Sequence, residues 1–318
     1  MRCTRLIPAL VLSLMVHQSA AAQEIAPAPA PVVRLSGYLQ ARETWQENAG
    51  LTGSINRARL AASGVVATDF SWKLQGEFRT GNVGNGKASV SLVDAYIRWS
   101  HRQLGLQVGQ FKTPFTWEYM TALPDLETAD RATAVDSLAP KRDIGVMGDY
   151  RFAGVARVYA GVFNGEGTNV TFNKDSSALG VGRLEIRPIS TIEVGAGVAR
   201  YFGDSTRYSF DANYAGPRFI VRGEYVAQAR DSLGGSKDHG WFALGAVKTV
   251  PQLQLVFKYE DFRRDQISLQ QRDRAWTAGA NAFLHGEAVR LSMEYVSRKI
   301  GDPGVRTGVL LTQLQLRY

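Results

Sequence analysis

Long apolar runs are missing from this chain of 318 residues, and cysteine is nearly absent. No window approaches the roughly 18 uninterrupted apolar residues that a membrane-spanning helix needs, which excludes a helical membrane protein. A single cysteine, Cys3, excludes a disulfide scaffold, and a composition that is 45% apolar excludes a disordered chain. The length is sufficient for two soluble domains or for one large β-barrel.

The N-terminus has the features of an export signal. Arg2 and Arg5 precede an apolar core at 6–16, and three alanines stand before Gln23. We therefore expect residues 1–22 to be a signal peptide, and residues 23–32, where proline alternates with alanine, to be an extended linker. Cys3 would leave with the signal, so the exported protein would have no thiol.

Period-two alternation dominates the rest of the chain. At the C-terminus Leu314, Leu316 and Tyr318 fall on one face of an extended segment, while Gln315 and Arg317 fall on the other. A helix would scatter both sets. We expect about sixteen such strands, near 33–46, 55–67, 71–80, 89–100, 104–112, 142–152, 155–163, 177–187, 191–202, 206–214, 218–229, 239–249, 252–263, 274–284, 288–299 and 308–318.

The connections between these strands alternate in length. Tight connections, as at 101–103 and 215–217, alternate with longer glycine-rich ones such as 81–88 and 164–176. Short turns at one end, long loops at the other and an even strand number are typical of a bacterial outer-membrane barrel. Lipid offers no hydrogen-bond partners, so a spanning sheet must close on itself. A secreted sandwich or a soluble barrel is the alternative, but neither needs this asymmetry.

Basic residues outnumber acidic ones by roughly two to one on the polar faces of the predicted strands. Sixteen strands enclose an interior too wide for side chains to fill, so we expect a water-filled channel with a cationic wall in residues 33–318. Arginine stays charged and can replace the hydration of phosphate or another oxyanion. For any single arginine, pairing with a nearby carboxylate that stiffens the wall is an equal alternative.

The connection at 113–141 is much longer than the others, and it carries several carboxylates. We expect this third long loop to fold inward and narrow the pore. Salt bridges to barrel arginines, for example from Asp125 or Glu127, would hold it in place.

Several motifs together resemble one family. They are VGQFKTPF at 108–115 followed by Glu118, the pair Arg57 and Arg59, LVDAY at 92–96, DIGV at 143–146, YAGVFNG at 159–165 and QLQLRY at 313–318. They look like the phosphate-selective porins of the O and P type across most of the exported chain. The resemblance implies a sixteen-stranded barrel that forms trimers, with the third long loop inside each pore and basic side chains guiding phosphate or polyphosphate. The terminal aromatic, Tyr318, implies recognition by the barrel-assembly machinery.

We therefore expect a porin in the outer membrane of a Gram-negative cell, surrounded by lipid, through which small anions diffuse passively. The pore-lining candidates are Arg57, Arg59, Lys73, Lys112, Arg131, Lys141, Arg142, Arg183 and Arg222. The acidic loop supports an alternative, a general or cation-tolerant porin for small organic solutes. A plugged barrel with a surface-binding role is more distant.

Patterns of catalytic, metal-binding or nucleic-acid-binding proteins are lacking. His101, His239 and His285 are dispersed, and neither Gly-x-Ser-x-Gly nor His-Glu-x-x-His occurs. We expect no enzymatic activity, no metal, no cofactor and no nucleic-acid partner.

Overall fold

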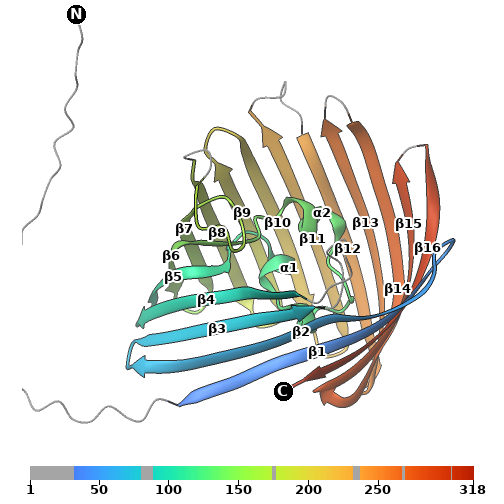
Figure 1. Ribbon diagram of the computed structural model, residues 1–318, viewed down its shortest axis with the longest axis horizontal. Helices are drawn as coiled ribbons and strands as arrows, with labels where there is room; N and C mark the ends of the chain where they lie inside the picture. The colour runs from blue at the N-terminus through green and yellow to red at the C-terminus, as the bar shows by residue number, and fades with distance from the viewer. Residues whose placement is uncertain (1–31, 80–88, 174–176, 232–236, 267–268, 302) are drawn as a thin grey trace, which may run out of the picture. The chain divides into compact units, whose positions relative to one another are not determined.

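The computed structural model describes residues 32–318 apart from 80–88, 174–176, 232–236, 267–268 and 302. In this part of the chain, sixteen strands pair antiparallel in sequence order, and β1 closes the barrel against β16 (Figure 1). The predicted closed barrel of sixteen strands is thereby confirmed. The predicted signal peptide and almost all of the predicted linker lie outside the described residues, as does the predicted long connection 81–88.

The strands are somewhat longer than predicted, mostly at the end of the barrel that carries the long connections. Their bounds are β1 Val33–Gln46, β2 Gly50–Ala67, β3 Phe70–Arg79, β4 Ser89–His101, β5 Leu104–Lys112, β6 Arg142–Phe152, β7 Ala156–Phe163, β8 Leu179–Ile189, β9 Ile192–Tyr201, β10 Ser205–Ala215, β11 Phe219–Arg230, β12 Lys237–Val250, β13 Leu253–Gln266, β14 Leu269–Glu287, β15 Val289–Gly301 and β16 Gly304–Arg317.

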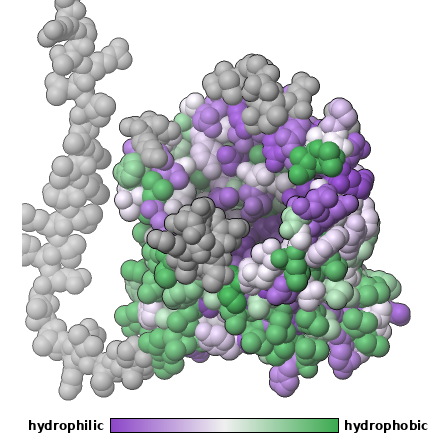
Figure 2. Space-filling model, turned by 45° about the vertical axis from the view of Figure 1, so that its right-hand side comes forward, coloured by the Kyte–Doolittle hydropathy of each residue, from purple (hydrophilic) through white to green (hydrophobic). Residues whose placement is uncertain are grey.

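Alternation separates the two faces of the sheet. Along β5, Leu104, Leu106 and Val108 are exposed, whereas Gln107 between them is buried. A closed sheet has one outer and one inner face, so the exposed apolar row is the outer face and the polar row is the inner face. Figure 2 shows hydrophobic residues gathered in a belt around the lower part of the visible face, and hydrophilic residues above it and in the hollow at the centre.

Tight turns join the strands at one end of the barrel. The turn between β6 and β7 is an example, because Ala153 and Gly154 both adopt positive φ, 42° and 75°, as a sharp reversal of two strands requires. Among the described residues, no helix is both long and apolar enough to cross a membrane.

The segment 113–141 joins β5 to β6 and contains the helices of the described chain. They are α1 Trp117–Met120, a 3-10 helix Leu123–Asp125 and α2 Thr133–Leu138. Figure 1 draws α1 and α2 within the ring of strands. The main apolar cluster lies here, where Phe115 and Val135 join a group with inner-face residues such as Phe242 and Leu244. The core is therefore built between this segment and one side of the inner face.

Candidate functional site

The segment 113–141 is bound to the inner face from β8 to β16. Its backbone carbonyls accept hydrogen bonds from wall side chains: Phe115 O from Arg183 Nη1 at 3.0 Å, and Leu126 O from Arg290 Nη1 at 3.0 Å. Its backbone N–H groups donate to wall carboxylates: that of Ala129 reaches Glu294 Oε1 at 2.7 Å, and that of Glu118 reaches Glu224 Oε2 at 3.0 Å. Buried backbone groups need such partners, so these side chains fix the path of the segment.

Ion pairs add to this docking. Arg222 donates two hydrogen bonds to the carboxylate of Glu127, at 2.9 and 2.7 Å, and Arg317 forms an ion pair with Asp125. Arg42 pairs with Asp130 at 2.9 Å. The predicted salt bridges from Asp125 and Glu127 to barrel arginines are confirmed.

Two of the predicted pore cations bind the end of α1. Lys112 Nζ donates to Met120 O at 3.1 Å and to Thr121 O at 2.8 Å. Arg131 donates to Thr121 O at 3.0 Å and to Glu118 O at 3.1 Å, and its guanidinium lies 4.8 Å from the centre of the Tyr119 ring. Cations are favourable at a helix C-terminus because its last carbonyls lack partners. Both side chains thus position the segment.

On the other side of the lumen, from β2 to β7, six cations are arranged around three buried carboxylates. We call these six the basic ladder: Arg57, Arg59, Lys73, Arg98, Arg142 and Arg157.

Each carboxylate of this region serves two cations. Glu77 accepts from Arg59 at 2.5 Å and lies 3.6 Å from Arg57. Asp94 is 3.0 Å from Lys73 Nζ and 2.7 Å from Arg142 Nε.

The third carboxylate lies nearer to the tight turns. Asp149 lies 2.7 Å from both Arg98 and Arg157. Arg157 is the second residue of β7, so the ladder leads toward the tight-turn end of the barrel.

The cations of the ladder are more accessible than its carboxylates. The side chains of Lys73 and Arg157 are 30% and 28% exposed, whereas that of Asp149 is 1% exposed. Among the described residues of this region, six cations against three carboxylates leave three positive charges in excess, and it is the cations that face the lumen. Such a wall attracts anions.

The remaining predicted site residues lie elsewhere. Arg183 on β8 is fully buried and is held between Asp211, at 2.7 Å, and Glu185, at 3.2 Å. Arg222 on β11 binds the segment, as described above. Lys141 is exposed where the segment ends. The structure therefore gathers Arg57, Arg59, Lys73 and Arg142 in the basic ladder. Arg183, Arg222 and Lys141 lie outside it.

The prediction omitted Arg98 and Arg157 from the candidate site. Both are on polar faces, but alternation alone does not distinguish them from other inward arginines. A further signal is Gly105, because a Cβ at this position would collide with Arg98 and Asp149. A glycine at an inward position of a strand can thus indicate that two charged side chains from the neighbouring strands form an ion pair over it.

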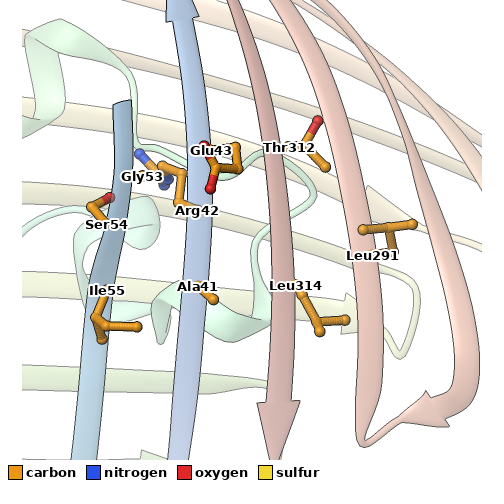
Figure 3. A pocket seen from close by; sticks show the side chains of 9 residues that line it. All are labelled: Ala41, Arg42, Glu43, Gly53, Ser54, Ile55, Leu291, Thr312 and Leu314. Carbon is orange, nitrogen blue, oxygen red and sulfur yellow. The ribbon is translucent and has the colours of Figure 1, made fainter. Parts of the chain in front are cut away.

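Apart from the lumen, a recess of about 520 Å³ lies between β1, β2, β15 and β16 (Figure 3). Ala41, Leu291 and Leu314 line it together with Glu43 and Gly53. By alternation these residues belong to the outer face. This recess is therefore separate from the lumen.

A family model described as phosphate-selective porin O and P matches residues 37–232 of the chain. The chain belongs to this family. Membership in the phosphate-selective porin O and P family, together with the closed barrel, places the protein in the outer membrane. A search of curated protein sequences finds no match.

Solved porin structures share the fold. An anion-selective porin from Comamonas acidovorans is 12% identical with a TM-score of 0.71, covering 91% of this chain and 100% of that chain. The outer membrane channel DcaP of Acinetobacter baumannii is 12% identical with a TM-score of 0.70, covering 91% and 97%. The trimer form of OmpT from Vibrio cholerae is 13% identical with a TM-score of 0.67, covering 91% and 100%.

Proposed function

We propose that the protein is an anion-selective porin through which phosphate, polyphosphate and similar small anions diffuse down their gradients. The observation that carries this proposal is the basic ladder, with two cations on each of three buried carboxylates and with Lys73 and Arg157 the most exposed of the six. Excess positive charge on one wall concentrates anions in the lumen. Guanidinium and ammonium donors replace part of their hydration as they pass.

The segment 113–141 is the constriction in this proposal. Its contacts with the inner face from β8 to β16 support it, because they leave the basic ladder as the wall opposite. Lys112 and Arg131 contribute by holding α1 in place, and Arg183 by holding Phe115. Lys141, Arg142 and Arg222 complete the set of cations around the path.

The test is the reversal potential of single channels in a planar bilayer under a potassium chloride gradient, followed by titration with phosphate. A chloride-selective potential with partial block by phosphate is expected. A potential near zero, or one selective for potassium, with no block would contradict anion selectivity and leave the barrel intact.

The alternative, a cation-tolerant porin for small organic solutes, rests on Asp130. Its side chain is 56% exposed beside Arg42, so the segment presents a carboxylate to the lumen. The same reversal potential separates the two functions, because the cation-tolerant pore would give a value near zero.

We also propose a homotrimer whose barrels are inserted by the barrel-assembly machinery through Tyr318. The outer recess supports a protein contact. The carboxylate of Glu43 lies there beside Leu291 and Leu314 and makes no hydrogen bond or ion pair within the described part of the chain, an unfavourable state for a carboxylate facing lipid. The mass of the detergent-solubilised protein distinguishes one copy from three.

A further inference from the structure

Three arginines surround a recess on the inner face at the tight-turn end of the barrel. The recess has a volume of about 290 Å³ and is lined by residues of β6, β7, β8 and the turn after β6. We call it the mouth recess; its lining residues are Arg151, Gly154, Val155, Ala156, Arg157, Glu185 and Arg187. None of Arg151, Arg157 and Arg187 was among the predicted pore-lining residues.

The pairing of the strands brings like charges together in this recess. Arg151 and Arg157 stand directly opposite each other in the pairing of β6 with β7, and like charges in this position weaken a strand pair. Arg187 is adjacent, because its backbone N–H bonds to Val155 O across β7 and β8.

The carboxylates near the recess are already engaged. Glu185 accepts from Tyr159 Oη at 3.0 Å and from Arg183 Nε at 3.2 Å, and Asp149 is shared by Arg98 and Arg157.

The three guanidinium groups differ in how many of their N–H donors already have a hydrogen-bond acceptor. Arg187 bonds Glu193 through Nε at 2.8 Å, and 59% of its side chain remains exposed. The exposed guanidinium of Arg151 has no hydrogen bond or ion pair within the described residues. Arg157 uses Nε and Nη2 on Asp149 and lies over the ring of Tyr159, 4.6 Å from its centre. The recess therefore offers several guanidinium donors without an acceptor.

We infer that the mouth recess binds a multivalent oxyanion, one carrying phosphoryl or carboxyl groups, such as phosphate, pyrophosphate or citrate. Planar guanidinium groups recognise such oxygens with paired hydrogen bonds, and three positive charges favour a ligand with more than one negative charge. The inference deepens the proposed anion channel and rests on it for its biological role, because Arg157 belongs both to the basic ladder and to this recess. An anion leaving the ladder toward the tight turns would meet this site, and in outer-membrane barrels that end faces the periplasm.

The test is the block of single channels by pyrophosphate added to one side at a time. Channel orientation is assigned by thiol labelling in a Thr52→Cys background, since Thr52 is exposed near the long-connection end. In the unmodified channel, pyrophosphate from the tight-turn side should block at lower concentration than pyrophosphate from the other side. The double substitution Arg151→Gln with Arg187→Gln should weaken this block by at least about tenfold, since two hydrogen-bonding charges are lost.

Arg218→Gln is the matched control, because Arg218 lies in a tight turn at the same end but does not line the recess. It should leave the block unchanged. The inference fails if the double variant is blocked as before, if Arg218→Gln weakens the block equally, or if monovalent acetate blocks as well as pyrophosphate.

Citrate and phosphate, added in the same way, show which acid group the site prefers. The reversal potential of these channels in potassium chloride tests the proposed function separately. A channel without anion selectivity that still shows side-specific block at Arg151 and Arg187 would retain the binding site and lose the proposed function.

Discussion

From β2 to β7 the inner face places two cations on each of three buried carboxylates, whereas at Arg183 on β8 two carboxylates share one fully buried cation. In the first region the surplus charge is positive and partly exposed. In the second region, wall carboxylates such as Glu294 and Glu224 accept hydrogen bonds from backbone N–H groups of the segment 113–141.

The difference shows how one barrel wall can serve two purposes. An ionisable group that is covered by protein needs complete local pairing, since burial of an unpaired charge is costly. A group that borders water can leave part of its charge uncompensated, and only such a charge acts on a passing ion. Selectivity therefore depends on the balance of charges that remain accessible, and the total number of arginines on the inner face matters less.

The largest expected effect comes from neutralising the basic ladder. The variant carrying Arg57→Gln, Arg59→Gln and Lys73→Gln loses three of the six cations of the ladder, so the ratio of chloride to potassium permeability should fall by roughly tenfold, at the low end of enrichment by charged clefts. Reversal potentials in a potassium chloride gradient measure it.

The matched comparison is Arg59→Gln against Arg222→Gln. Both arginines bind one carboxylate and are about equally exposed, 10% and 11%. The first substitution should lower selectivity, and the second should loosen the segment at Glu127 and make the current noisier. Equal losses of selectivity in the two variants would remove the distinction between the two regions.

The fold was largely predictable because lipid and lumen impose opposite polarity on alternate residues. The predicted bounds of β1, β5 and β6 match the structure. β14 was predicted at 274–284 but extends over Leu269–Glu287. Toward the long-connection end the sequence of β14 becomes polar on both faces, as at the adjacent residues Arg272 and Asp273, so the alternation that reveals a strand disappears.

The site was less predictable, because alternation assigns a face and gives no partner. Arg142 and Arg183 carry the same sequence signal, yet one shares Asp94 with Lys73 and the other is enclosed by Asp211 and Glu185. Only the register of neighbouring strands decides which carboxylate lies within reach. Lys112 shows the same limit, because its contacts with α1 depend on the path of the segment.

A smaller effect is expected from two glycines that lie beneath ion pairs. A Cβ at Gly195 would collide with Arg183 and Asp211, and one at Gly105 would collide with Arg98 and Asp149. Gly195→Ala should lower the free energy of unfolding by about 3–5 kcal/mol, because it separates a fully buried pair. Gly105→Ala should cost about 1–2 kcal/mol, because Arg98 can move into the lumen.

Urea unfolding in lipid vesicles measures both values, and a change in anion selectivity should appear only in Gly105→Ala. A larger destabilisation in Gly105→Ala than in Gly195→Ala would contradict the assignment of the two regions.

The smallest effect on anion selectivity is expected from a group that couples pH to the docking of α1. Burial raises the pKa of the Glu118 carboxyl to about 7, against the pull of Lys258 and the Ala132 N–H in the other direction. The folded protein therefore binds this proton more tightly than the unfolded chain. The protonated carboxyl therefore contributes to the free energy of unfolding in full below pH 4.5. This contribution, about 3 kcal/mol at most, falls as pH rises and is lost above about pH 7.

In the structure the Ala132 N–H donates to Glu118 Oε2 at 3.0 Å. Glu118→Gln keeps an oxygen that can accept this hydrogen bond and removes the titratable carboxyl. Urea unfolding at pH 5 and pH 8 should show a drop in the unmodified protein that is clearly smaller in Glu118→Gln. The basic ladder does not depend on this group, so anion selectivity should change little between the two pH values. If both proteins lose the same stability, the pH dependence arises elsewhere on the wall, and Glu118 is not the group that couples the docked segment to pH.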